Sequence, residues 1–301
     1  MLPTRRSFIA SAAAIPFAAT SRAADAKAPV VDTHLHCFAG KDEPKFPYHK
    51  DAPYTPAEPA TPGHLLKCMA DGGVDYAIVV HPEPYQDDHR YLEHCLSVGK
   101  GKLKGTCLFF AGRAGNVEKL KALAKAVPLV AGRIHAYVEG RLPPFGKPEL
   151  KELWKQYAEL GLAVQLHFEP KYAPGFEPLI KAFKDTTVLI DHLGRPFQGT
   201  AKEYAVVLGW AKYPNVVMKL SSVPDNKSYP HRDPQPVVKQ LTEAFGADRL
   251  MYGGGYSASA TGKSYRAERE RVVGLLAHLS DADRAKVLGG TAVKLFKLGD
   301  A

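Results

Sequence analysis

The sequence predicts a single (β/α)8 barrel, in which parallel strands alternate with outer helices. Three observations point to this fold. Short β-branched runs alternate with amphipathic stretches along the whole chain after residue 26. The runs recur about every 30 residues, which is the length of one strand–helix unit in a barrel of this type. Several runs also end in histidine, and barrels gather their chemistry at the C-terminal ends of the strands.

Eight runs are the predicted strands, in the order Pro29–His36, Val74–His81, Leu103–Phe110, Leu129–Tyr137, Leu162–Phe168, Thr187–His192, Val216–Ser221 and Arg249–Gly254. The stretches between them are predicted helices, namely Gly63–Ala70, Asp88–Val98, Asn116–Ala126, Glu149–Leu160, Phe176–Phe183, Lys202–Ala211 and Val237–Phe245. Two further helices are expected at the end of the chain, Tyr265–Leu279 and Ala282–Leu298. The second is interrupted near Gly289–Gly290.

A doubly wound open sheet is the alternative fold for alternating strands and helices. Such a sheet would place a glycine-rich phosphate-binding loop after the first strand, and the residues after His36 contain none. The connection from Cys37 to Pro62 is long and rich in Pro, Lys and Asp. We expect it either to cross the top of the barrel as a lid or rim or to be a simple surface loop.

Residues 1–26 have the organisation of an export signal. Thr4-Arg5-Arg6-Ser7-Phe8-Ile9 is followed by an Ala-rich stretch and then by small residues up to Ala26. The adjacent arginines are typical of the twin-arginine type, which is read by a receptor. Cleavage after Ala23 and cleavage after Ala26 fit equally well. We therefore expect a periplasmic or secreted protein that uses the twin-arginine export machinery, with residues 27–301 as the barrel domain.

Composition excludes several classes of partner. The chain has 301 residues and a net charge of +9, from 40 Lys and Arg against 31 Asp and Glu. The basic residues are interspersed with acids, so we expect small anionic molecules rather than nucleic acid as partners. No apolar run reaches the roughly 20 residues that span a bilayer, so no stable membrane anchor is expected. The cysteines lack metal-binding spacing and are expected to be free thiols, namely Cys37, Cys68, Cys95 and Cys107.

Histidines at the ends of three strands form the strongest candidate site. His34 and His36 alternate on the first strand and therefore share a face. His167 ends the fifth strand, and His192 ends the sixth. Strand ends meet at one face of a barrel, so these four histidines can converge on one divalent cation, and neutral imidazole suits Zn²⁺. Other histidines near strand ends are expected to be satisfied core or rim side chains, namely His81 and His135.

Six motifs at these strand ends follow one another in a characteristic order. They are Asp-Thr-His-Leu-His at 32–36, Leu-His-Phe at 166–168, Ile-Asp-His-Leu-Gly-Arg-Pro at 190–196, Val-Met-Lys-Leu-Ser at 217–221, Arg-Leu-Met-Tyr-Gly at 249–253 and Gly-Thr-Ala at 290–292. From about Val30 to the end, the chain resembles the amidohydrolase-related (amidohydrolase 2) family.

The resemblance implies a TIM-barrel enzyme that opens lactones of sugar acids or 2-pyrone-4,6-dicarboxylate, or that decarboxylates aromatic or muconate-type acids. It also implies that His34, His36 and His167 are metal ligands, with zinc as the expected ion. His192 is implied as a general acid/base or as a polariser of the substrate carbonyl.

One position departs from the family pattern. Family members carry an aspartate at the end of strand eight that binds the metal and takes a proton from water, and this position falls on Gly255. Three alternatives stay open. His192 could act as the base with the metal weakly held or absent, or the barrel could bind a ligand without catalysis. A carboxylate from elsewhere could also substitute, with the nearest being Asp32, Glu169 and Asp191.

Several cations and aromatic residues are predicted to contact the substrate. Arg133, Arg195 and Lys219 could each hold a carboxylate, and Tyr256 could line the mouth with Tyr265. Arg195 could instead brace its own turn, and Lys219 could be the buried partner of an acid.

The primary expectation is an exported hydrolase that opens a small anionic lactone by water attack, with assistance from a metal and from histidine. The alternatives are non-oxidative decarboxylation at the same site and a catalytically impaired binding barrel. A Gly-x-Ser-x-Gly elbow, which would indicate a serine hydrolase, does not occur in the sequence.

Overall fold

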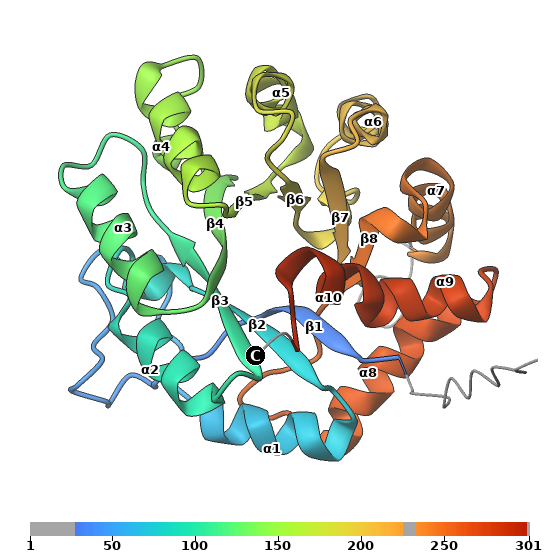
Figure 1. Cartoon of the computed structure of the whole chain (residues 1–301), viewed down its shortest axis with the longest axis horizontal. Coiled ribbons are helices and arrows are strands. Elements are labelled where there is room, and N and C mark those ends of the chain that lie inside the picture. Colours follow the sequence, from blue (N-terminus) through green and yellow to red (C-terminus); the bar gives the residue numbers. More distant parts are fainter. Residues whose placement is uncertain (1–27, 225–232, 300–301) are drawn as a thin grey trace, which may run out of the picture.

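The computed structural model describes residues 28–224 and 233–299. The predicted export signal lies outside the described residues. Eight parallel strands pair in chain order, as predicted, and helices surround them (Figure 1). The strands are β1 (Val31–Leu35), β2 (Tyr76–Val80), β3 (Leu103–Leu108), β4 (Leu129–Ala136), β5 (Ala163–Phe168), β6 (Val188–Ile190), β7 (Val216–Leu220) and β8 (Leu250–Tyr252).

Side chains help to join the first and last strands. Thr33 Oγ1 donates to the Tyr252 carbonyl oxygen over 2.7 Å. The backbone N–H of Gly254 donates to the Asp32 carboxylate over 2.8 Å. The sheet is therefore a nearly closed barrel, and the predicted fold class is confirmed.

The helices fall where the apolar periodicity places them. Those between strands are α1 (Pro62–Gly72), α2 (Arg90–Gly99), α3 (Asn116–Ala126), α4 (Pro148–Glu159), α5 (Ala173–Ala182), α6 (Ala201–Gly209) and α7 (Gln235–Phe245). Threonines cap three helices: Thr61 begins α1, Thr200 begins α6 and Thr261 begins α8 (Gly262–Leu275). A capped start satisfies backbone N–H groups that the helix itself leaves free.

The predicted interruption near Gly289 is a single π-helical turn, Lys286–Gly290, between α9 (Asp281–Ala285) and α10 (Thr291–Phe296). Glycine is required here because a Cβ at position 289 would lie 1.8 Å from the Pro29 carbonyl oxygen. The turn therefore lets the C-terminal segment approach the start of β1 closely.

The C-terminal helix closes one end of the barrel. Ala292 and Phe296 of α10 pack in one cluster with residues near the beginnings of strands, such as Val31, Ile78 and Val217. A larger apolar cluster lies between the strands and the outer helices and includes Trp154 and Trp210, both fully buried. Burying each large side chain contributes about 1.5–3 kcal/mol. The candidate functional site lies at the opposite end of the barrel, at the C-terminal ends of the strands.

The connection between β1 and α1 forms a wall at that end. Phe38 and Ala60 pair as an antiparallel bridge, with N–H···O distances of 3.0 and 2.8 Å. The Ala39 N–H donates to the Tyr85 hydroxyl over 2.8 Å, which ties the connection to the segment after β2.

The four cysteines are buried free thiols. Among the helices of the described residues, none is long and apolar enough to cross a membrane.

Candidate active site

The two histidines of strand one present free ring nitrogens. His34 Nδ1 lies 3.1 Å from Asp191 Oδ1, and His36 Nδ1 lies 2.7 Å from the Val80 carbonyl oxygen. Both partners are acceptors, so each Nδ1 carries the proton and each Nε2 keeps its lone pair. The His34 Nε2 is buried and has no hydrogen-bond partner among the described residues. Burial lowers the pKa of His34 well below its usual value and that of His36 to about 3, so both rings are neutral.

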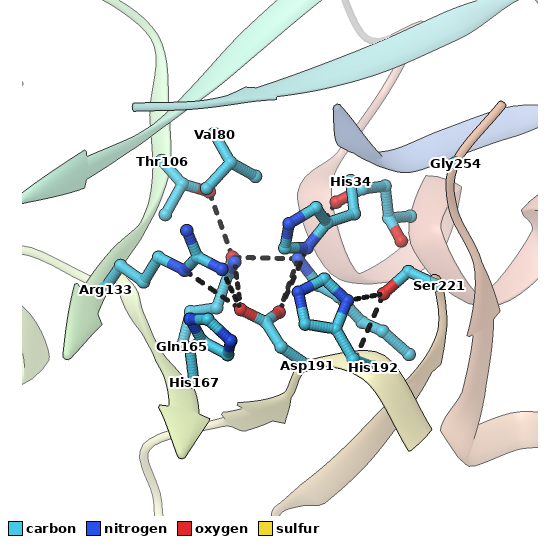
Figure 2. A network of polar contacts seen from close by, with 12 residues as sticks. His34, Val80, Thr106, Arg133, Gln165, His167, Asp191, His192, Ser221 and Gly254 are labelled. Carbon is cyan, nitrogen blue, oxygen red and sulfur yellow. Dashed lines mark hydrogen bonds and ion pairs between the residues drawn. The ribbon is translucent and has the colours of Figure 1, made fainter. Parts of the chain in front are cut away.

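Next to His34 lies a buried polar network whose side chains contact one another (Figure 2). Asp191 Oδ2 accepts from Arg133 Nε and from Gln165 Nε2, over 3.0 and 3.1 Å. Lys219 Nζ donates to the Thr33 carbonyl oxygen and to Gln165 Oε1, over 2.9 and 2.8 Å. The predicted substrate-binding residues Arg133 and Lys219 are only 3% and 0% exposed. The structure thus places both of them in this network.

Electrostatics keep Asp191 ionised. Burial alone would raise the pKa of the Asp191 carboxyl, but the neighbouring His34, Arg133 and Lys219 lower it well below its usual value. Burial lowers the pKa of Lys219 to about 8. An ionised Asp191 fixes the tautomer and orientation of His34, the role of a carboxylate that orients a metal-binding imidazole.

His192 stands on a turn of unusual backbone conformation. His192, Leu193 and Arg195 have φ values of +55°, +57° and +57°, a region that non-glycine residues rarely occupy. Ser221 stabilises the turn, because its Oγ accepts the His192 N–H over 3.2 Å and lies 3.0 Å from His192 Nδ1. The His192 ring centroid is 4.5 Å from that of His34. Burial lowers the pKa of His192 to about 4, so the ring is neutral at pH 7.

His167 is hydrogen-bonded to an arginine. Arg195 Nη1 lies 3.2 Å from His167 Nε2. Since a guanidinium only donates, this nitrogen accepts the bond and its lone pair is directed at Arg195. Ring contacts connect His167 to His192, at 5.0 Å, and to Tyr137, at 4.7 Å. The assignment of His167 as a third metal ligand stays a prediction.

The side chains at the strand ends border two cavities, and both cavities are lined by His192 and Ser222. The larger lobe has a volume of about 540 Å³, and its lining includes His34, His36, Tyr256 and Glu268. The smaller lobe has a volume of about 260 Å³, and its lining includes His167 and Arg195. Three of the four predicted site histidines thus line one lobe, and His167 and His192 line the other.

The glycine run after β8 shapes the larger lobe. Gly255 has φ of +103°, and a Cβ at this position would lie 2.9 Å from the Tyr265 ring and 3.2 Å from Cβ and Cγ of Glu268. Tyr265 does not line either lobe; its hydroxyl donates to Asp32 Oδ2 over 2.5 Å. Burial raises the pKa of Asp32 to about 7. Both Asp32 oxygens therefore accept hydrogen bonds from within the protein, from the Gly254 N–H and the Tyr265 hydroxyl.

The donor atoms present fit a divalent cation. Histidine nitrogens from His34 and His192 and an oxygen of Asp191 lie within 4.8 Å of one another. His36 adds a fourth donor, because its ring centroid is 5.2 Å from that of His34 and its Nε2 is free. Neutral imidazoles with orienting hydrogen bonds on the opposite nitrogen are characteristic ligands of zinc and similar ions.

The remaining residues singled out in the sequence lie outside this cluster. His81 Nε2 donates to the Gln86 carbonyl oxygen over 2.9 Å. His135 Nδ1 lies 3.2 Å from Glu83 Oε1, and both side chains are largely buried. Glu169 is a partner of Lys171, at 3.4 Å. Two residues of the site had not been anticipated, namely Ser221 and Glu268; Ser221 stood within a quoted motif, whereas Glu268 carries no local signal.

The fold and the strand-end histidines define a barrel of the kind that metal-assisted hydrolases use. Residues 31–298 match the family model described as Amidohydrolase. The chain therefore belongs to the amidohydrolase family, as its motifs predicted, and it is a hydrolase of that family.

Its similar proteins include two lactone hydrolases. The chain is 27% identical over 237 residues to the 2-pyrone-4,6-dicarboxylate hydrolase of Comamonas testosteroni, covering 74% of this chain and 75% of that one. It is 26% identical over 253 residues to the L-fucono-1,5-lactonase of Burkholderia ambifaria, covering 76% and 80%. A solved structure of a protein from Pseudomonas putida, assigned as a 2-pyrone-4,6-dicarboxylic acid hydrolase, superposes with a TM-score of 0.71 at 22% identity. It covers 91% of this chain and 99% of that one.

Proposed function

We propose that this protein hydrolyses a small anionic lactone, adding water to the ring carbonyl and opening the ring to a hydroxy acid. The observation that carries the proposal is the position of His192, a neutral imidazole at the junction of two cavities, one of which offers a cation for the substrate. Two relatives whose sequences match 74% and 76% of this chain are lactone hydrolases, which supports the same reaction class.

Arg195 would bind the anionic group. Its guanidinium lines the smaller lobe, and its single hydrogen bond among the described residues is the one to His167. The other N–H groups of the fork are available for a carboxylate, which arginine can bind in a bidentate manner. This contact would place the lactone carbonyl near His192, since Arg195 follows His192 by three residues on the same turn.

His192 would move the proton. A neutral ring can accept a proton from the attacking water as the C–O bond to water forms. The resulting imidazolium can deliver that proton to the ring oxygen as the original C–O bond breaks, so the reaction consumes one water and releases no other product. Ser221 orients the imidazole through its Nδ1, which leaves Nε2 for this exchange.

A divalent metal would be held by His34 and His36 through their Nε2 atoms, while Asp191 orients His34 and His192 keeps its Nε2 for the proton. When bound, such an ion polarises a carbonyl or lowers the pKa of water. An amidohydrolase of the same fold from Burkholderia multivorans contains zinc; it superposes with a TM-score of 0.66 at 17% identity. We propose that this metal is zinc. We also propose that the protein is exported to the periplasm by the twin-arginine signal predicted in residues 1–26.

The test is a lactone panel assayed with the wild type and with His192→Ala. We expect ring opening by the wild type and a loss of about 10²–10⁴-fold in kcat/KM in the variant, which is the usual contribution of a general acid/base. Circular dichroism and thermal melting should show an unchanged fold. An unaffected rate in His192→Ala would exclude the assigned role, and saturable binding without turnover in the wild type would indicate a binding barrel.

A further inference from the structure

A second cluster of polar side chains lies after the ends of β2 and β4, and its centre is Glu83, which is 6% exposed. The Tyr137 hydroxyl donates to Glu83 Oε2. His135 Nδ1 and Arg141 Nη1 lie 3.2 and 3.4 Å from Glu83 Oε1. Burial alone would raise the pKa of the Glu83 carboxyl, but His135 and Arg141 lower it below its usual value. Glu83 is therefore an ionised acceptor, and the reaction proposed above gives it no role.

The backbone holds Glu83 in a fixed place. Pro82 and Pro84 flank it, and each proline ring fixes its own φ angle. The Glu83 carbonyl oxygen accepts from the backbone N–H and from the side-chain Nε2 of Gln86, over 2.8 and 2.9 Å. A carboxylate on such a turn is a firm anchor for the tyrosine hydroxyl that it binds.

Tyr137 connects this anchor to the smaller lobe. Its ring centroid lies 4.7 Å from that of His167, and the guanidinium carbon of Arg195 lies over the same ring at 5.7 Å. Arg195 Nη1 lies 3.2 Å from His167 Nε2. One tyrosine ring thus contacts both partners of this hydrogen bond, while its hydroxyl is bound to Glu83. The contacts form a continuous chain from Glu83 through Tyr137 to Arg195.

Arg195 depends on these contacts for its orientation. Its hydrogen bond within the described parts of the chain is the one to His167. The charge of Glu169 also acts on Arg195, but Glu169 pairs with Lys171 at 3.4 Å. An arginine side chain has many rotamers, and ordering it when a ligand binds weakens binding. A guanidinium that is already held against the Tyr137 ring avoids much of this cost.

We propose that Glu83 and Tyr137 are positioning residues, which hold the Arg195 guanidinium in the orientation that binds the anionic group of the substrate. Neither residue lines a lobe, so both act through Arg195 rather than on the substrate. This inference rests on the proposed function, in which Arg195 binds that group. Releasing the Tyr137 hydroxyl should therefore weaken the recognition of charge and leave the chemical step unchanged.

The test compares two molecules of the same shape, the anionic lactone 5-oxotetrahydrofuran-2-carboxylate and its neutral carboxamide. The wild type should favour the carboxylate by more than about tenfold in KM, and Arg195→Ala should lose this preference. Tyr137→Phe keeps the ring and removes the hydroxyl, and should reduce the preference about three- to tenfold with kcat unchanged. A metal at His34 and His36 would act on the lactone carbonyl that both molecules share, so a preference that persists in Arg195→Ala would contradict the proposal.

A remote tyrosine provides the matched control. The Tyr213 hydroxyl donates to Glu177 over 2.6 Å, and neither of these residues lines a lobe. Tyr213→Phe should leave the preference unchanged. Glu83→Ala should act like Tyr137→Phe, and the double variant should lose no more than the stronger single variant, because both substitutions remove the same bond. Glu83→Gln keeps an oxygen for the Tyr137 hydroxyl and should retain most of the preference.

The ratio between the two molecules separates positioning from a general structural role. An equal loss for both molecules in Tyr137→Phe, or an unchanged preference in this variant, would overturn the proposal. Calorimetry with the same two molecules measures Kd and requires no turnover. A binding preference that falls in Tyr137→Phe without any lactone opening would refute the proposed hydrolysis and support the positioning of Arg195. Lactone opening with an unchanged preference would do the reverse.

Discussion

Two groups of polar side chains lie next to each other at the strand ends and differ in how their hydrogen-bonding capacity is used. In the buried network, Arg133, Gln165 and Lys219 direct their donors at Asp191, at each other or at backbone. At the rim, His34 and His36 each use Nδ1 in a hydrogen bond, and no partner for Nε2 occurs in the part of the chain that the structure describes. The difference shows that polarity alone does not identify a functional residue. A residue becomes a candidate when a neutral, buried donor or acceptor remains unused beside a cavity.

Removing the centre of the buried network should have the largest effect on stability. Asp191→Ala leaves Arg133 and Lys219 buried without their carboxylate, and unpaired buried charges cost about 3–5 kcal/mol. We expect the free energy of unfolding in urea to fall by this amount.

Asp281→Ala is the matched control, because Asp281 pairs with Arg284 at the surface and is 95% exposed on its side chain. We expect little change in this variant, since exposed ion pairs are screened by solvent. Equal effects of the two substitutions on the free energy of unfolding would mean that the Asp191 network does not stabilise the fold.

At the rim, a smaller effect on the reaction is expected from Ser221→Ala. This substitution removes the hydroxyl that contacts both the backbone and the ring of His192. One such hydrogen bond contributes about 0.5–1.5 kcal/mol, so we expect kcat to fall by up to about tenfold with KM unchanged. Steady-state kinetics measures both parameters. An unchanged kcat, or a loss confined to KM, would contradict the orienting role of Ser221.

Much of the fold could be predicted from the sequence, because strand and helix periods are local properties. Each predicted strand overlaps the observed one, and the break near Gly289 is present as a π-helical turn. The grouping of His34, His36 and His192 around one cavity also followed from their positions at strand ends. The export signal lies outside the described residues and stays a prediction.

The sequence did not show how deeply a strand side chain is buried in the barrel, or which distant segments contact each other. Arg133 and Lys219 lie on the same strands as expected, but they point into the barrel interior, where partners from other strands surround them. The contact of Arg195 with His167 joins residues 28 positions apart. Glu268 reaches the site from a helix, and the packing of that helix against Gly255 has no sequence signature.

The most direct test of the central claim is the metal content of the folded protein, purified without chelator or histidine tag. If the free Nε2 atoms of His34 and His36 form a metal site, the wild type should contain near-stoichiometric divalent metal, with zinc expected. The double variant His34→Ala/His36→Ala should contain almost none while it remains folded. His278→Ala, which removes an exposed histidine remote from the cavity, should retain the wild-type content. Absence of metal from the wild type, or equal content in the double variant, would contradict the account.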